Sequence, residues 1–130
     1  MKIEKKFWKN KKILITGITG FKGSWLSVLL LKLESNVYGY ALKPNKESLF
    51  NILKLKKKIN ICYGDIRNYE KLETYLLKIK PDIIIHMAAQ TLVIESYKNP
   101  IYNFETNILG VINLFEIIKK KYLKSIVLNI

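Results

Sequence analysis

The chain alternates short apolar runs with longer segments in which apolar residues recur at helical spacing. The runs are rich in Ile, Leu and Val and cover residues 13–15, 36–42, 59–63, 82–87 and 125–130. A run without regular polar alternation is typical of a strand buried on both faces of a parallel sheet. The segments between them, at 24–33, 46–55, 68–80 and 100–122, predict helices. Five strands that alternate with four helices predict one doubly wound, parallel α/β sheet that ends with the fifth strand.

Three glycines spaced three apart follow the first predicted strand. Gly17, Gly20 and Gly23 lie between that strand and the first helical segment. This order places free backbone N–H groups and the positive end of a helix dipole at one point, which favours a pyrophosphate. Gly17 suits a tight turn, Gly20 the close approach of a dinucleotide, and Gly23 the packing of the helix on the strand. The stretch indicates a dinucleotide-binding site, although a purely structural turn would use the same residues.

The ends of the second and third predicted strands bear on the type of dinucleotide. An acidic residue usually follows the second strand and bonds the adenosine ribose, but Tyr40, Ala41 and Leu42 occupy this region and Lys43 comes next. Lys43 is compatible with a 2′-phosphate, so the residues leave NADP open beside NAD, and a solvated lysine is the simpler interpretation. Asp65 follows the third strand, where it either accepts the adenine amino group or caps the next helix.

The other reactive side chains give no catalytic residue and no metal site. His86 is the only histidine and ends the fourth predicted strand, where we expect its neighbours to satisfy it. Cys62 is the only cysteine, so it cannot form an internal disulfide, and its apolar neighbours predict a buried thiol. The residues 1–11 are polar and basic, and their two aromatic side chains, Phe7 and Trp8, are expected to cover the lower edge of the sheet.

Composition excludes several classes of function. The chain has 130 residues, enough for one domain, and a net charge of +13 carried by 22 lysines and a single arginine, Arg67. Specific readers of nucleic acid favour arginine and cluster their charge, so we expect no specific nucleic-acid partner. Nothing in the sequence resembles a signal peptide or a membrane-spanning run. A cytoplasmic protein without a membrane partner is the expectation.

Several motifs together resemble the extended short-chain dehydrogenase/reductase superfamily, over nearly the whole chain. They are Thr16-Gly17-x-Thr19-Gly20-Phe21-Lys22-Gly23-Ser24-Trp25, Gly64-Asp65-Ile66-Arg67, His86-x-Ala88-Ala89-Gln90, Ser96-Tyr97-x-x-Pro100 and Thr106-Asn107-x-x-Gly110. The stretches FKGSW, YGYALKP and MAAQ are similar to those of CDP-glucose 4,6-dehydratases in particular. Ile18 stands where these dehydratases usually have histidine, which weakens the assignment of the sugar nucleotide more than that of the cofactor.

The resemblance implies a Rossmann fold with tightly held NAD. The complete enzyme would oxidise C4 of a nucleotide hexose, eliminate water across C5 and C6, and return the hydride to C6. Members of the family are expected to form homo-oligomers. The resemblance further implies a pyrophosphate site at Thr19, Gly20, Phe21, Lys22 and Gly23, an adenine site at Asp65 and Ile66, and a nicotinamide side at Ala88, Ala89, Gln90 and Thr91, completed by Thr106 and Asn107.

The catalytic pair of the superfamily is absent from the sequence. This pair is Tyr-x-x-x-Lys, in which the lysine lowers the pKa of the tyrosine so that it acts as a base. None of the eight tyrosines has a lysine four residues later. We therefore expect the amino-terminal cofactor half of a dehydratase, inactive alone, with an exposed apolar edge strand that promotes association. A nucleotide-sugar epimerase or GDP-mannose-type dehydratase fragment, and a dinucleotide-binding module without chemistry, are the alternatives.

Overall fold

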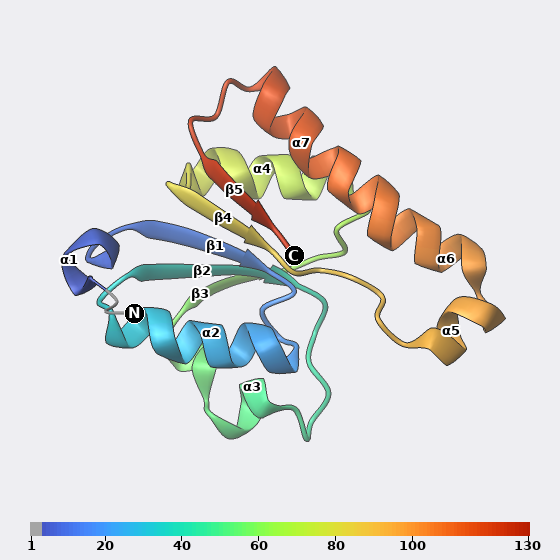
Figure 1. Cartoon of the computed structure of the whole chain (residues 1–130), viewed down its shortest axis with the longest axis horizontal. Coiled ribbons are helices and arrows are strands. Elements are labelled where there is room, and N and C mark those ends of the chain that lie inside the picture. The colour runs from blue at the N-terminus through green and yellow to red at the C-terminus, as the bar shows by residue number, and fades with distance from the viewer. Residues whose placement is uncertain (1–3) are drawn as a thin grey trace.

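The computed structural model describes residues 4–130 and contains one five-stranded sheet (Figure 1). All neighbouring strands are parallel, in the order β3-β2-β1-β4-β5. The strands are β1 (Lys12–Thr16), β2 (Asn36–Ala41), β3 (Asn60–Tyr63), β4 (Ile83–His86) and β5 (Ile126–Asn129). The chain winds outward from β1 in one direction and returns to β4 on its other side, so the switch point lies between β1 and β4. The predicted doubly wound fold is confirmed.

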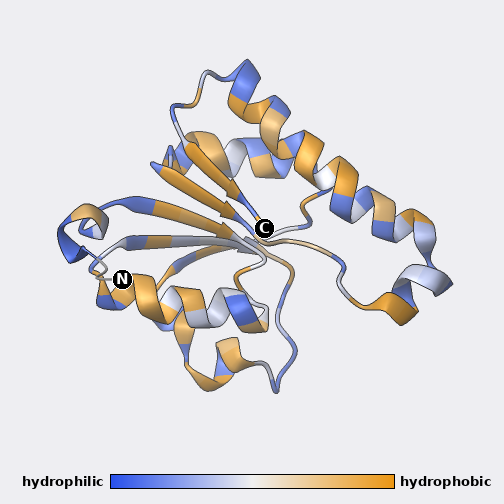
Figure 2. Cartoon of the chain, in the orientation of Figure 1, coloured by the Kyte–Doolittle hydropathy of each residue, from blue (hydrophilic) through white to orange (hydrophobic). Residues whose placement is uncertain are grey.

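Helices cover both faces of the sheet. On one face lie α2 (Phe21–Lys32) and the short α3 (Leu49–Ile52), and on the other lie α4 (Tyr69–Ile79) and α7 (Gly110–Lys120) (Figure 1). The apolar centre of β1 explains this arrangement, because Ile13 and Ile15 pack on the α2 side while Leu14 packs on the α4 side. Both sets are fully buried. Figure 2 shows β4 as hydrophobic along its centre, as a strand covered on both faces requires.

Two predicted helices are interrupted. The segment 46–55 forms only α3 and a 3₁₀ turn at Leu55–Lys57, because Lys54 adopts a left-handed conformation with φ 52° between them. The segment 100–122 stays helical, but a π-helical turn at Glu105–Leu109 separates α6 (Pro100–Phe104) from α7. The sequence did not predict α5 (Val93–Lys98).

The predicted lead-in at residues 1–11 contains α1 (Lys5–Trp8), and its residues 1–3 lie outside the described part. Trp8 packs against the core on the α2 side, as expected, and its carbonyl accepts a hydrogen bond of 2.9 Å from Ser35 Oγ. Phe7 is half exposed and contacts the Trp8 ring edge-on. Only Trp8 therefore covers this edge of the core.

Among residues 4–130, exposed apolar side chains include those of the edge strand β5 and those along α6 to α7. On the edge strand β5, Ile126 and Leu128 are 66% and 53% exposed; they pair in register with Ile83 and Ile85, whose side chains face the α2 side. The predicted exposed edge is therefore present. A second surface runs along α6, the π turn and α7 and comprises Ile101, Phe104, Ile108, Ile112 and Phe115. Among residues 4–130, every helix is too short or too polar to span a bilayer.

Candidate functional site

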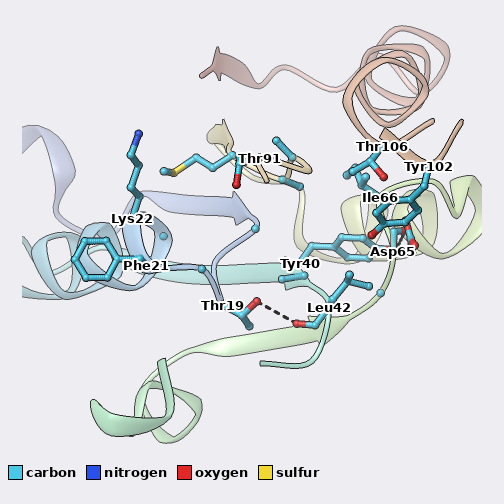
Figure 3. A pocket seen from close by; sticks show the side chains of 18 residues that line it. Thr19, Phe21, Lys22, Tyr40, Leu42, Asp65, Ile66, Thr91, Tyr102 and Thr106 are labelled. Carbon is cyan, nitrogen blue, oxygen red and sulfur yellow. Dashed lines mark hydrogen bonds between the residues drawn. The ribbon is translucent and has the colours of Figure 1, made fainter. Parts of the chain in front are cut away.

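A cavity of about 530 Å³ lies at the carboxyl ends of β1, β2, β3 and β4. Figure 3 shows Phe21, Lys22 and Thr19 on one side of it and Asp65, Tyr102 and Thr106 on the other. Open parallel sheets bind ligands in this position. Most of the residues predicted for cofactor binding line it, namely Gly17, Thr19, Gly20, Phe21, Lys22, Gly23, Asp65, Ile66, Ala88, Ala89, Thr91 and Thr106. Gln90 and Asn107 do not.

The glycine turn is held against the end of β4. Gly17 has a φ of +70°, and a Cβ there would lie 2.8 Å from the Met87 carbonyl oxygen and 2.9 Å from Ala88 Cα. A Cβ at Gly23 would lie 2.7 Å from the Gly17 carbonyl oxygen. At Gly20 the nearest atom is 3.3 Å away, again the Gly17 carbonyl oxygen. Gly17 and Gly23 are thus required by the fold, whereas a Cβ at Gly20, which lines the cavity, would meet a single tight contact.

The start of α2 forms the floor of the cavity beneath this turn. Gly20 is the N-cap residue, and within the described chain no side chain caps the first turn of this twelve-residue helix. The N–H groups at Phe21, Lys22 and Gly23 therefore remain available at the positive end of the helix dipole. Thr19 Oγ1 donates a 3.1 Å hydrogen bond to the Leu42 carbonyl, which ties the turn to the end of β2 (Figure 3). The arrangement suits a pyrophosphate.

Asp65 forms the opposite corner and is held by Arg67. The Arg67 backbone N–H donates to Asp65 Oδ1 at 2.9 Å, and Arg67 Nη2 donates to Oδ2 at 2.7 Å. These hydrogen bonds lower the pKa of the Asp65 carboxyl, which is an anion at neutral pH. Asn68, not Asp65, caps α4, because its Oδ1 accepts the Lys71 N–H at 3.0 Å. Of the two predicted roles of Asp65, helix capping is wrong, and adenine binding stays a prediction.

Thr16 and His86 shape the end of β4. Thr16 Oγ1 accepts the N–H groups of Met87 and Ala88, both at 3.1 Å, and lies 2.7 Å from His86 Nδ1. A hydroxyl that accepts twice donates its own hydrogen, so Nδ1 is the acceptor and the ring carries its hydrogen on Nε2. Burial lowers the pKa of His86, which keeps the ring neutral. Its Nε2 has no hydrogen-bond partner in the described residues, so only Nδ1 finds a hydrogen-bond partner among the neighbouring residues.

Gln90 and Asn107 hold the loop that follows β4. Asn107 Oδ1 accepts the Gln90 N–H at 2.7 Å, and Asn107 Nδ2 donates to the Gln90 carbonyl at 3.0 Å. One side chain thus satisfies both backbone groups of Gln90 and fixes the loop to the π turn. Neither residue lines the cavity, and their predicted part in cofactor binding stays a prediction.

Sequence reasoning missed several lining residues: Tyr40, Ala41, Leu42, Gly64, Met87 and Tyr102. Burial raises the pKa of Tyr40 to about 12, and its hydroxyl donates to the Asp65 carbonyl at 3.0 Å. A Cβ at Gly64 would lie 2.4 Å from the Tyr40 hydroxyl oxygen, so a glycine beside a strand end was the available signal. Tyr102 stacks on Arg67, with 4.6 Å from the guanidinium carbon to the ring centroid. No local pattern indicated that contact.

Ile18 lies in the core, and Cys62 is less buried than its apolar neighbours predicted. Ile18 is fully buried in the core on the α2 side and does not line the cavity. A Cβ at Gly39 would lie 2.6 Å from Ile18 Cγ2, so these two residues lock the glycine turn onto β2. Cys62 is only partly buried, although it packs against the core on the α4 side.

Comparison with known proteins places this geometry in a family. The family profile described as GDP-mannose 4,6 dehydratase matches residues 14–128, most of the chain. The chain belongs to this family. CDP-glucose 4,6-dehydratase of Salmonella typhimurium (strain LT2) is 46% identical over 119 residues, covering 91% of this chain and 33% of that protein. UDP-glucose 4-epimerase of Pisum sativum is 33% identical over 127 residues, covering 92% and 36%.

A solved structure that resembles this chain has the same kind of name as the sequence relatives. The UDP-glucose 4-epimerase of Thermus thermophilus, determined in complex with NAD, matches with a TM-score of 0.74 at 29% identity and covers 85% of this chain and 34% of that one. The resemblance to the extended short-chain dehydrogenase/reductase superfamily is confirmed. This member of the GDP-mannose 4,6 dehydratase family spans about a third of the length of the relatives it matches.

Proposed function

We propose that the chain binds NAD in the 530 Å³ cavity, as the cofactor-binding portion of a nucleotide-sugar 4,6-dehydratase that acts on CDP-glucose. One observation carries the proposal: the glycine turn and the uncapped start of α2 face Asp65 and Ile66 across a single cavity. The 46% identity to a CDP-glucose 4,6-dehydratase and the NAD complex of a solved relative support it.

The residues present fit this cofactor. The N–H groups at the start of α2 are suited to the pyrophosphate, and the space at Gly20 admits it. The anionic Asp65 carboxylate is suited to the adenine amino group, which is a donor. Ala88 and Ala89 are small enough for a nicotinamide to lie against the backbone after β4. When bound, NAD accepts a hydride from the sugar and returns it.

The dehydration chemistry needs a base, and the chain does not offer the Tyr-x-x-x-Lys pair that would provide one. Within the sequence no tyrosine has a lysine four positions later. The test is to supply the full-length form with CDP-, dTDP-, UDP- and GDP-hexoses and to identify the products by mass. Loss of water from CDP-glucose is the expected result. A product of unchanged mass with inverted C4 would show that the full-length protein is an epimerase. The 33% identity to UDP-glucose 4-epimerase favours this alternative.

Binding is tested on the 130-residue chain itself by calorimetric titration with NAD and with NADP. We expect saturable binding of NAD. Lys43 lies in a second cavity of about 480 Å³ that shares Thr19, Gly20 and Phe21 with the first, so a 2′-phosphate would meet this lysine. Lys43→Glu should therefore weaken NADP more than NAD. A folded chain that binds neither dinucleotide would refute the proposed function.

Two further parts of the proposal concern the context of the protein. The exposed stripe of Ile101, Phe104, Ile108, Ile112 and Phe115 supports association of copies into a homo-oligomer through α6 and α7. A cytoplasmic location, where sugar nucleotides and NAD are available, agrees with the free thiol of Cys62. Light scattering of a variant with Ile108 and Ile112 changed to Ser would test the first part, because association through this stripe should weaken.

A further inference from the structure

We propose that Arg67 is a positioning residue that makes the cavity selective for adenine, by tying Asp65, which follows β3, to Glu105 and Tyr102 of the α6 and π-turn segment. This inference rests on the proposed binding of NAD. It concerns how the adenine corner is built, and neither the family match nor the relatives assign this role.

The guanidinium of Arg67 donates hydrogen bonds to both of these segments. Towards Asp65, Nη2 donates to Oδ2 at 2.7 Å and Nε donates to Oδ1 at 3.0 Å. Towards the π turn, Nη1 donates to Glu105 Oε2 at 2.7 Å. The guanidinium also stacks on Tyr102, and the Arg67 side chain is 31% exposed. Bidentate, partly buried contacts of this kind fix orientation as well as charge, which a lysine would not do.

Glu105 lies at the start of the π-helical turn Glu105–Leu109. It and the next two residues reach three different partners. Glu105 binds Arg67, Thr106 lines the cavity, and Asn107 holds Gln90. Arg67 is thereby attached to the segment that closes the cavity.

The contacts of Arg67 limit what Asp65 can bind. A carboxylate offers about four acceptor positions. The backbone N–H of Arg67 donates to Oδ1, Nη2 donates to Oδ2, and Nε is shared between the two oxygens at 3.0 and 3.1 Å. These three donors hold the carboxylate in one orientation and leave about one acceptor position, which suits a single N–H donor such as the adenine amino group. A base with a carbonyl oxygen at that position would be repelled.

The backbone of this corner is held independently of the Arg67 side chain. Asn113 Nδ2 donates to the carbonyls of Ile66 and Arg67 at 3.3 and 3.1 Å, and the Tyr40 hydroxyl donates to the Asp65 carbonyl. Substitution of Arg67 should therefore remove the side-chain donors to Asp65 while the loop keeps its conformation and the backbone N–H of residue 67 keeps its contact. This separates a positioning role from a folding role.

The experiment measures the affinity of the 130-residue chain for NAD and for nicotinamide hypoxanthine dinucleotide, which carries an oxygen in place of the adenine amino group. We expect the unaltered chain to prefer NAD by about tenfold, the effect of one charge-assisted hydrogen bond. Arg67→Met should reduce this preference to about twofold, and Arg67→Lys should restore it only in part. Glu105→Gln should lower it, whereas the control Glu116→Gln, which breaks the exposed ion pair with Lys120, should not.

Each outcome decides the matter. If Arg67→Met weakens both dinucleotides by the same factor, Arg67 only supports the fold and the proposal is wrong. The same holds if the preference for NAD is unchanged. If Arg67→Met does not fold, as judged by thermal unfolding, the milder variant Glu105→Gln takes its place. The same ratio of affinities for the two dinucleotides is then measured on that variant. A failure of the unaltered chain to bind NAD would overturn the proposed function first, and this inference with it.

Discussion

Replacing each glycine of the turn by alanine should separate folding from binding. Gly17→Ala introduces a Cβ at a φ of +70° and presses it against the backbone of Met87 and Ala88. Gly20→Ala adds the same methyl group at a φ of −73°, with only the Gly17 carbonyl oxygen nearby at 3.3 Å. The first change should therefore destabilise the fold, and the second should mainly fill the space that the proposed pyrophosphate needs.

The magnitudes follow from the contacts. A residue other than glycine in the left-handed region costs about 1–2 kcal/mol, and overpacking adds about 1–3 kcal/mol. The clash at Gly17 cannot relax easily, because both partners are backbone atoms at 2.8 and 2.9 Å. Gly17→Ala should thus lose about 2–5 kcal/mol, a large fraction of the roughly 5–15 kcal/mol of a typical domain. Gly20→Ala exchanges one N-cap residue for another, at about 1 kcal/mol or less.

Urea unfolding and calorimetric titration with NAD provide the two measurements. A loss of about 3 kcal/mol moves the urea midpoint by about 1–3 M, so the effect of Gly17→Ala is readily seen. Gly20→Ala should keep a midpoint close to that of the unaltered chain and bind NAD at least roughly tenfold more weakly. The reasoning is refuted if Gly17→Ala is as stable as the unaltered chain, or if Gly20→Ala binds NAD equally well.

Three further changes test other parts of the structure. Asn107→Ala leaves both backbone groups of Gln90 unpaired and should cost about 1–3 kcal/mol in urea unfolding, with weaker NAD binding; unchanged stability would contradict the anchoring role. The free energy of unfolding should fall as the pH drops below 6.5 towards the lowered pKa of folded His86, because the unfolded ring takes up a proton that the buried ring does not. The free energy of unfolding should change by up to about 1.4 kcal/mol per pH unit. Urea unfolding across this pH range should show that His86→Gln removes this dependence. An equal dependence in the variant would mean that another group causes it. Ile126→Lys with Leu128→Lys should reduce association of the chain at roughly tens of micromolar in light scattering; a monodisperse unaltered chain would show that the edge is harmless.

The sequence predicts those features whose causes are local. The strand centres at 13–15 and 83–85 are apolar throughout because both faces of the sheet are covered, and this pattern needs no tertiary information. The helix caps at Asn68 and Asn99 also follow from adjacent residues, and each side chain accepts the predicted type of backbone hydrogen bond. The glycine turn is predicted for the same reason.

Features that depend on distant contacts escaped prediction. The apolar spacing of 100–122 indicates a regular helix, and nothing in it marks the π turn at whose start Glu105 binds Arg67. The single arginine of the sequence belongs to the Gly64-Asp65-Ile66-Arg67 motif, but nothing local indicates that it contacts Glu105 and Tyr102, which are far away in the chain. Lys54, whose left-handed conformation ends α3 early, is likewise an ordinary lysine in the sequence.

The central claim is that the start of α2 receives the pyrophosphate of NAD. The most direct measurement is an NMR titration of the isotope-labelled 130-residue chain with NAD, followed through its backbone amide signals. The claim predicts that the amides of Phe21, Lys22 and Gly23 shift in a saturable manner, while that of Lys78, near the end of α4, does not. Saturable shifts centred elsewhere, or a well-folded chain whose α2 amides do not respond, would contradict it.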